Sequence, residues 1–125
     1  MKANPADRFQ FESYWLNHWD AHHLRLEIDE AAAWAHENNV PLICDEFGVN
    51  RDNSDNADVV GGVLVTDPAS RFGWIHDVRT AFEADGIGWA TWEYRGGWAV
   101  TTKEDGQAAQ PDPAMMEALG LHGIK

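Results

Sequence analysis

Two short segments of this chain combine acidic and aromatic residues at the end of an apolar run. The first is Asp45-Glu46-Phe47-Gly48 after residues 40–44, and the second is Trp92-Glu93-Tyr94, which ends residues 87–92. A carboxylate at the end of an apolar strand loses hydration unless it is hydrogen-bonded or has a chemical task, which is the setting of a nucleophile or a general base. The alternative is a carboxylate that only caps a loop or faces a helix.

The alternation of side chains along a strand separates the two neighbouring carboxylates. Successive side chains point to opposite faces, so Leu42, Cys44 and Glu46 are predicted to share one face and Asp45 to take the other. Asp45 and Glu46 then cannot act together as a catalytic pair. Cys44 is expected to be a small core residue, because no base or lysine stands beside it to activate a thiolate.

Tryptophan is unusually frequent, with seven residues in a chain of 125. Trp89 and Trp92 are three positions apart, so on a strand one is expected in the core and the other at the mouth of a site. Sugar rings have apolar C–H faces that pack on flat aromatic rings, and carboxylates bind sugar hydroxyls. An acidic, tryptophan-rich cleft therefore suits a neutral polysaccharide, whereas the alternative for any single tryptophan is core packing.

The apolar periodicity predicts helices alternating with strands. One or two helices are expected over residues 15–39, because Leu24, Ile28, Ala31, Ala32 and Ala35 recur at three- and four-residue spacing. Residues 40–44 predict a strand buried on both faces, and residues 59–65 a short hairpin or a loop insertion. A helix is expected from the cap Asp67 to Gly86, a second buried strand over residues 87–92, and a last helix from the cap Asp112 to Gly120. This order predicts an α/β fold with parallel strands, whose carboxyl ends carry both acidic and aromatic segments.

The charge balance excludes several classes of partner. Asp and Glu number 21 against nine Lys and Arg, a formal net charge of −12, and the cations are scattered. Nucleic acid and anionic membrane surfaces are therefore not expected as partners. The sequence has no apolar run that could span a membrane, residues 1–8 lack the apolar centre of a signal peptide, and the single Cys44 excludes an internal disulfide.

A group of histidines is a weak metal-site signal. His18 and His22 are four residues apart on an expected helix, and this spacing can hold a divalent ion such as zinc. No third ligand stands at a defined spacing, so solvated histidines, His23 among them, are the favoured interpretation. We predict no metal and no organic cofactor.

The chain resembles a known enzyme family through the order and spacing of three segments. These are Val40-Pro41-Leu42-Ile43-Cys44-Asp45-Glu46-Phe47-Gly48-Val49, residues 71–82, and Gly86-Ile87-Gly88-Trp89-Ala90-Thr91-Trp92-Glu93-Tyr94-Arg95-Gly96-Gly97-Trp98. Together they resemble the C-terminal part of glycoside hydrolase family 5, the cellulases and endoglucanases, over residues 31–121. The resemblance implies a single unit over residues 1–125 that forms part of a (β/α)8 barrel, namely its last two strands with their helices.

The resemblance also implies a site and a reaction. Glu46 would be the nucleophile of a retaining hydrolysis of β-glucan, and Trp92 would lie under the sugar that is cleaved. Glu93 stands where the family commonly has Asp, and Trp98 where it often has Phe, so both are expected to contact substrate. The family is often secreted, but the chain itself leaves the localisation open.

The sequence contains only half of the catalytic pair that this chemistry needs. A retaining glycosidase requires a second carboxyl group about 5 to 5.5 Å from the nucleophile. In the family it comes from an Asn-Glu-Pro segment, which this sequence lacks, and 125 residues are too few for a barrel of roughly 250 residues. Glu93 is the nearest substitute, but if Trp92 faces the cleft, Glu93 faces away.

Three readings therefore stay open. The first is a C-terminal fragment of a glycoside hydrolase that lacks its acid/base. The second is a non-catalytic barrel remnant that binds carbohydrate or associates with another copy or chain, because two strands leave sheet edges unpaired. The third is a truncated chain without independent function.

Overall fold

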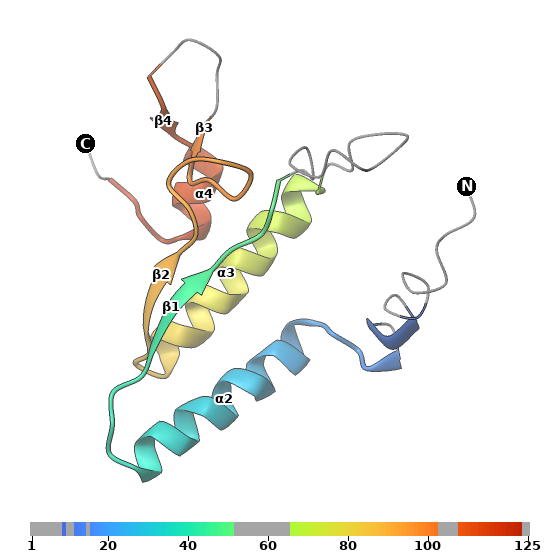
Figure 1. Cartoon of the computed structure of the whole chain (residues 1–125), viewed down its shortest axis with the longest axis vertical. Helices are drawn as coiled ribbons and strands as arrows, with labels where there is room; N and C mark the ends of the chain where they lie inside the picture. The colour runs from blue at the N-terminus through green and yellow to red at the C-terminus, as the bar shows by residue number, and fades with distance from the viewer. Residues whose placement is uncertain (1–8, 10–11, 15, 52–65, 103–107, 124–125) are drawn as a thin grey trace.

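The computed structural model of the chain describes residues 9, 12–14, 16–51, 66–102 and 108–123. Within these residues the elements are, in order, α2 (Ala21–Glu37), β1 (Ile43–Phe47), α3 (Pro68–Ala84), β2 (Gly88–Thr91), β3 (Thr101–Thr102), β4 (Gln110–Pro111) and α4 (Pro113–Ala118). β1 pairs with β2 in parallel, and β3 pairs with β4 antiparallel. Figure 1 shows β1 and β2 side by side along α3, and α4 packs against α3. The parallel pair and the alternation of helix and strand confirm the predicted α/β class.

The caps of α3 and α4 agree with the sequence signals. The Asp67 carboxylate accepts a hydrogen bond from the Ser70 amide at 2.8 Å, and the Asp112 carboxylate accepts from the Ala114 amide at 3.0 Å. Each cap is followed by a proline in the first turn, where a missing N–H costs nothing. Gly86 and Gly120 follow the two helices with φ of 69° and 67°, a left-handed conformation that favours glycine. Both helices are confirmed.

Of the one or two helices predicted over residues 15–39, the structure has two, because residues 12–14 and 16 are helical and α2 begins only at Ala21. His18 has a φ of 49°, so a right-handed helix cannot continue through it, and the helix begins after Asp20, whose carboxylate accepts from the His23 amide at 3.0 Å. The end of the helix at Asn38 and Asn39 is as predicted. His18 and His22 therefore do not share a helix, and the basis for a metal site at that spacing is wrong. Among the described residues, no group of three or more His, Cys, Asp or Glu side chains could hold a metal ion.

A single apolar core lies between the helices and one side of the parallel strands. Ile75 of α3 and Met115 of α4 are fully buried at its centre, and Phe47 closes it from β1. The remaining members are Ile28, Ala32, Val78, Ala81, Phe82, Ile87, Ala118 and Leu119. Ala31, expected on the apolar stripe of α2, is exposed.

The first strand differs from the prediction in position and in burial. It runs over Ile43–Phe47 instead of residues 40–44. Its pairing with β2 begins at the hydrogen bond that the Gly88 amide donates to the Leu42 carbonyl, at 3.0 Å. The expectation of burial on both faces is wrong, because Ile43 is 66% exposed. The physical reason is that the described helices cover only one side of the strand pair.

The strict alternation predicted for β1 is also wrong. Cys44 pairs with Trp89 and Phe47 with Thr91, so the register shifts between Cys44 and Phe47. Both Cys44 and Phe47 consequently pack against the core, although they are three residues apart. Glu46 therefore does not share a face with Cys44; it is exposed.

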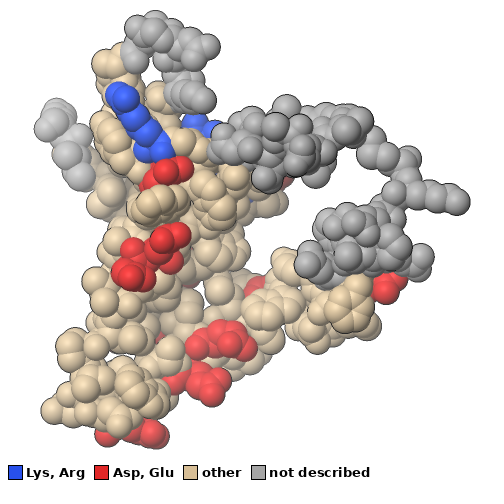
Figure 2. All heavy atoms as spheres, in the orientation of Figure 1, with Lys and Arg blue, Asp and Glu red and all other residues tan. Residues whose placement is uncertain are grey.

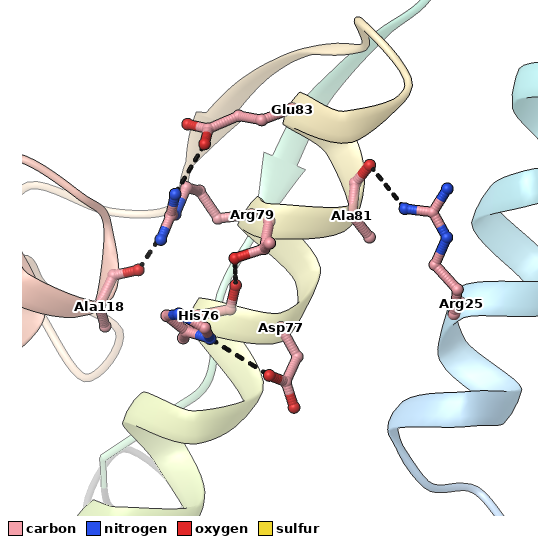
Figure 3. A network of polar contacts seen from close by, with 8 residues as sticks. Arg25, His76, Asp77, Arg79, Ala81, Glu83 and Ala118 are labelled. Atoms are coloured by element: carbon pink, nitrogen blue, oxygen red, sulfur yellow. Dashed lines mark hydrogen bonds and ion pairs between the residues drawn. The ribbon is translucent and has the colours of Figure 1, made fainter.

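Polar contacts fasten α3 to its two neighbouring helices, as Figure 3 shows. From α2, Arg25 donates to the Ala81 carbonyl at 3.2 Å and to the Asp85 carboxylate at 2.7 Å. On the other side, Arg79 donates to the Ala118 carbonyl of α4 at 3.3 Å and to Glu83 at 2.6 Å. These contacts position α3 behind the strands.

The surface reflects the acidic composition. In the view of Figure 2, Asp and Glu atoms occupy separate patches along the face, and Lys and Arg atoms are visible only in its upper part. Among the described residues, no helix has the length and apolar character needed to cross a membrane. The hairpin expected over residues 59–65 lies outside the described residues.

The one-sided core predicts a contrast between two isoleucines. We expect Ile75→Ala to lower the free energy of unfolding by about 2 to 5 kcal/mol, because it opens a cavity at a fully buried site. Ile43→Ala, at an exposed site of the same residue type, should cost less than about 1 kcal/mol. Urea unfolding of both variants measures the difference, and an equal cost at Ile43 would mean that the open face of β1 is covered in solution.

Candidate functional site

The carboxyl ends of β1 and β2 meet at one edge of the parallel pair. The Trp92 amide donates to the Phe47 carbonyl at 2.8 Å, and the Thr91 hydroxyl donates to the same oxygen at 3.1 Å. Trp92 makes this contact itself, and Glu46 directly precedes Phe47 in the chain. The structure therefore brings the two acidic and aromatic segments together, as the sequence predicted. The peptide bond between Trp92 and Glu93 is cis.

Glu46 is accessible at this edge. Its side chain is exposed, and none of the residues that the structure describes bonds to its carboxylate. Trp92 is 48% exposed, whereas Trp89 packs against the core with its ring at 5.7 Å and 89° to that of Phe47. The two tryptophans thus divide between core and surface, and the exposed one stands at the end of the strand.

Glycine at position 48 permits the close approach of the two strand ends. A Cβ at Gly48 would collide with the Trp92 carbonyl oxygen and would lie 3.4 Å from a ring carbon of Trp98. The Trp98 side chain therefore lies beside Gly48, two residues from Glu46. Trp98 is 37% exposed, so part of its ring is available to a ligand.

The carboxylate of Glu93 lies in its own loop. A Cβ at Gly96 would collide with this carboxylate, and Gly96 has a φ of 121° that favours glycine. The loop is closed by the hydrogen bond from the Val100 amide to the Glu93 carbonyl at 2.8 Å. Glu93 is half-buried against this turn, while Tyr94, which follows it, is 65% exposed.

Arg71 joins the loops that follow the two strands, and sequence reasoning missed it. From α3, its buried guanidinium donates to the Val49 carbonyl at 2.9 Å, to Ala99 at 3.1 Å and to Trp98 at 3.4 Å. Burial lowers the pKa of Arg71 from its ordinary value, and the neighbouring Arg51 lowers it further. Because Val49 follows Glu46 closely in the chain, this one side chain links the segment of Glu46 to that of Trp98.

Arg51 reinforces the same junction. It donates to the carbonyls of Ala99 at 2.8 Å and Thr101 at 2.9 Å, and its amide donates to the Gly97 carbonyl at 2.8 Å. A sequence signal for Arg71 did exist. It stands four residues before Ile75 and therefore on the buried face of the helix, where a cation must find buried partners.

The arginine junction generates a prediction about its stability. Arg71→Met should leave carbonyls of both loops without a donor and lower the free energy of unfolding by at least about 2 kcal/mol. Arg95→Met is the matched control, because Arg95 is exposed in the loop after β2, and it should behave like the wild type. Denaturant unfolding followed by tryptophan fluorescence reports both, and wild-type stability of Arg71→Met would contradict the role given to Arg71.

Comparison with known proteins finds similarity in solved structures. No protein-family model and no curated protein matches the sequence. The cellulose synthase subunit Z (CcsZ) of Clostridioides difficile matches with a TM-score of 0.63 and 25% identity over 79% of this chain. A hyperthermophilic endo-β-1,4-glucanase in complex with substrate matches with a TM-score of 0.61 and 27% identity over 82% of this chain. Cel5A of Thermotoga maritima, in complex with mannotriose, matches with a TM-score of 0.62 and 26% identity over 80% of this chain.

The matches cover only part of those proteins. This chain spans 28% of the length of CcsZ and of the hyperthermophilic endoglucanase, and 27% of the length of Cel5A. The matched region is the C-terminal part of each. In structure as in sequence, the chain resembles the C-terminal part of the cellulases and endoglucanases of glycoside hydrolase family 5.

Proposed function

We propose that this chain supplies the nucleophile side of a retaining glycoside hydrolase site of the endoglucanase type, with β-glucan as substrate. The observation that carries the proposal is the contact of the strand ends. The Trp92 amide bonds to the Phe47 carbonyl at 2.8 Å and thereby holds Trp92 beside the segment of Glu46. In the (β/α)8 architecture, active sites lie at the carboxyl ends of the strands, and β1 and β2 would be the last two strands of that barrel.

Each residue of the site has a proposed role. The Glu46 carboxylate forms a bond to the anomeric carbon as the bond to the leaving oxygen breaks, and water later hydrolyses the glycosyl-enzyme. Trp92 packs under the sugar ring, with Trp98 beside it, and Glu93 accepts hydrogen bonds from sugar hydroxyls. This chemistry uses two carboxyl groups and requires no metal or organic cofactor.

The proton for the leaving oxygen must come from outside the described site. A second carboxyl group about 5 to 5.5 Å from the nucleophile is needed. The Glu93 carboxylate lies against Gly96 in its own turn, which argues against that role. We propose that the acid belongs to the polypeptide that completes the barrel, and the chain alone should show no turnover of soluble cellulose in a reducing-end assay.

A chimeric enzyme tests the nucleophile directly. Residues 31–121 of this chain would replace the matching C-terminal segment of the hyperthermophilic endo-β-1,4-glucanase. In an active chimera, Glu46→Gln should reduce kcat on soluble cellulose by on the order of 10³-fold or more, because an amide cannot form the glycosyl-enzyme. Unchanged thermal unfolding would show that the chimera still folds.

Asp45→Asn is the matched control for this experiment. Asp45 is an exposed carboxylate next to Glu46, so the same loss of charge occurs one residue away. We expect its kcat to stay within a few fold of the parent chimera. Equal losses in the two variants would remove Glu46 from the mechanism.

The open face of the strand pair favours a second candidate function. Ile43 is 66% exposed on a sheet whose edges are unpaired within the described residues, so a non-catalytic remnant could associate with a second copy or another chain. Light scattering after size exclusion at two protein concentrations tests this candidate. A mass that rises with concentration supports association, and a constant monomer mass rejects association with a second copy.

A further inference from the structure

A pocket of about 320 Å³ lies outside the candidate catalytic site, between the beginning of α2 and the N-terminal half of α3. Its volume is at the lower end of small-molecule sites. The aromatic and polar side chains that line it are Tyr14, Trp19, Asp20, Ser70, Trp74 and Asp77. They come from α3 and from the segment that leads into α2, so the pocket exists only in the folded chain.

The three aromatic rings of this pocket are partly open to solvent, and two of them contact another ring. Tyr14, Trp19 and Trp74 are 54%, 44% and 39% exposed. The ring of Trp19 lies 4.2 Å from that of His23, and the ring of Trp74 lies 6.4 Å from that of Phe47. Three partly exposed rings around one pocket leave apolar surface in contact with water, which costs free energy and is typical of binding surfaces.

The charged groups of the pocket restrict the chemistry of a ligand. Among the described residues that line it, the charged ones are Asp20 and Asp77, and two carboxylates disfavour an anionic ligand. The hydrogen bond from the His23 amide holds the pKa of Asp20 below its ordinary value, so this group is an ionised acceptor at neutral pH. Asp77 lies on the side of α3 toward α2 (Figure 3), and its Oδ1 is 3.2 Å from His76 Nδ1. Because a carboxylate can accept several hydrogen bonds, the Asp77 carboxylate can still accept hydrogen bonds from sugar hydroxyls.

The pocket is separate from the edge that carries Glu46. Trp74 contacts Phe47 from the helix side of the sheet, where Phe47 is buried in the core. Glu46, the preceding residue, is exposed and outside that core. The pocket therefore lies on the helix side of β1, and Glu46 is not among the residues that line it.

We propose that this pocket is a second, non-catalytic carbohydrate-binding site that holds a neutral glucan chain on the helical surface. Flat aromatic rings contact the apolar faces of the sugar, and Asp20 and Asp77 accept hydrogen bonds from its hydroxyls. The choice of a β-glucan as ligand rests on the proposed function, whereas the pocket itself does not.

Binding of cellohexaose to the full chain, measured by calorimetry, tests the proposal. Trp19→Ala and Trp74→Ala should each weaken binding at the pocket by at least about tenfold. Trp34→Ala is the matched control, because Trp34 is 56% exposed on the same α2 helix but does not line the pocket. Trp74 also touches Phe47, so Trp19→Ala and Asp77→Ala provide the readout if Trp74→Ala fails to fold.

The outcomes separate this inference from the proposed function. Binding that survives Trp92→Ala and is lost in Trp19→Ala supports the second site. Binding that is lost in Trp92→Ala and unchanged in Trp19→Ala and Asp77→Ala overturns it, while leaving the catalytic proposal intact. The absence of any binding to cellohexaose at millimolar concentration also overturns the inference. Aromatic rings with carboxylates can hold an organic cation as well. A pocket that binds tetramethylammonium through the same residues, and does not bind the sugar, therefore overturns it too.

Discussion

The buried guanidinium of Arg71 is the contact on which the geometry of the candidate site depends. It bonds to carbonyls of both loops that leave the parallel strands, and Arg51 shares the Ala99 carbonyl with it. The hydrogen bonds of these two side chains to other described residues all go to backbone oxygens, so within that part of the chain two cations are held near one another without a carboxylate bonded to either. The nearby Asp112 carboxylate opposes the lowering of the Arg71 pKa by burial and by Arg51, and so offsets part of the repulsion between the two cations. If this junction were lost, Glu46 and Trp98 would no longer be held by the same side chain.

The strand pair has two unlike sides. On the helix side, Phe47 and Ile87 close a core around Ile75, and on the other side Ile43 is open. Parallel sheets are normally covered on both faces, but within the described residues this pair of strands has one open face and two unpaired edges. This chain spans 28% of the length of CcsZ and of the hyperthermophilic endoglucanase, and the partial barrel that we propose accounts for the open face and for the missing acid together.

Catalysis and attachment to substrate are assigned to different parts of this small structure. The chemistry is proposed at the ends of β1 and β2, which carry an exposed carboxylate and an exposed tryptophan, and the second site is proposed at the start of the helices. Phe47 lies between them, because its ring meets Trp74 while its carbonyl accepts from Trp92.

Local signals in the sequence determined the caps at Asp67 and Asp112, the α/β order, and the placement of Glu46 and Trp92 at strand ends. Helix caps, apolar periodicity and strand ends all depend on residues that are close together in the chain. Sequence reasoning failed where distant segments decide. The register shift in β1, the bare face at Ile43 and the arginine junction depend on which other segment packs against each residue. Their cause is tertiary packing, in which burial and hydrogen-bond partners come from parts of the chain far away in sequence.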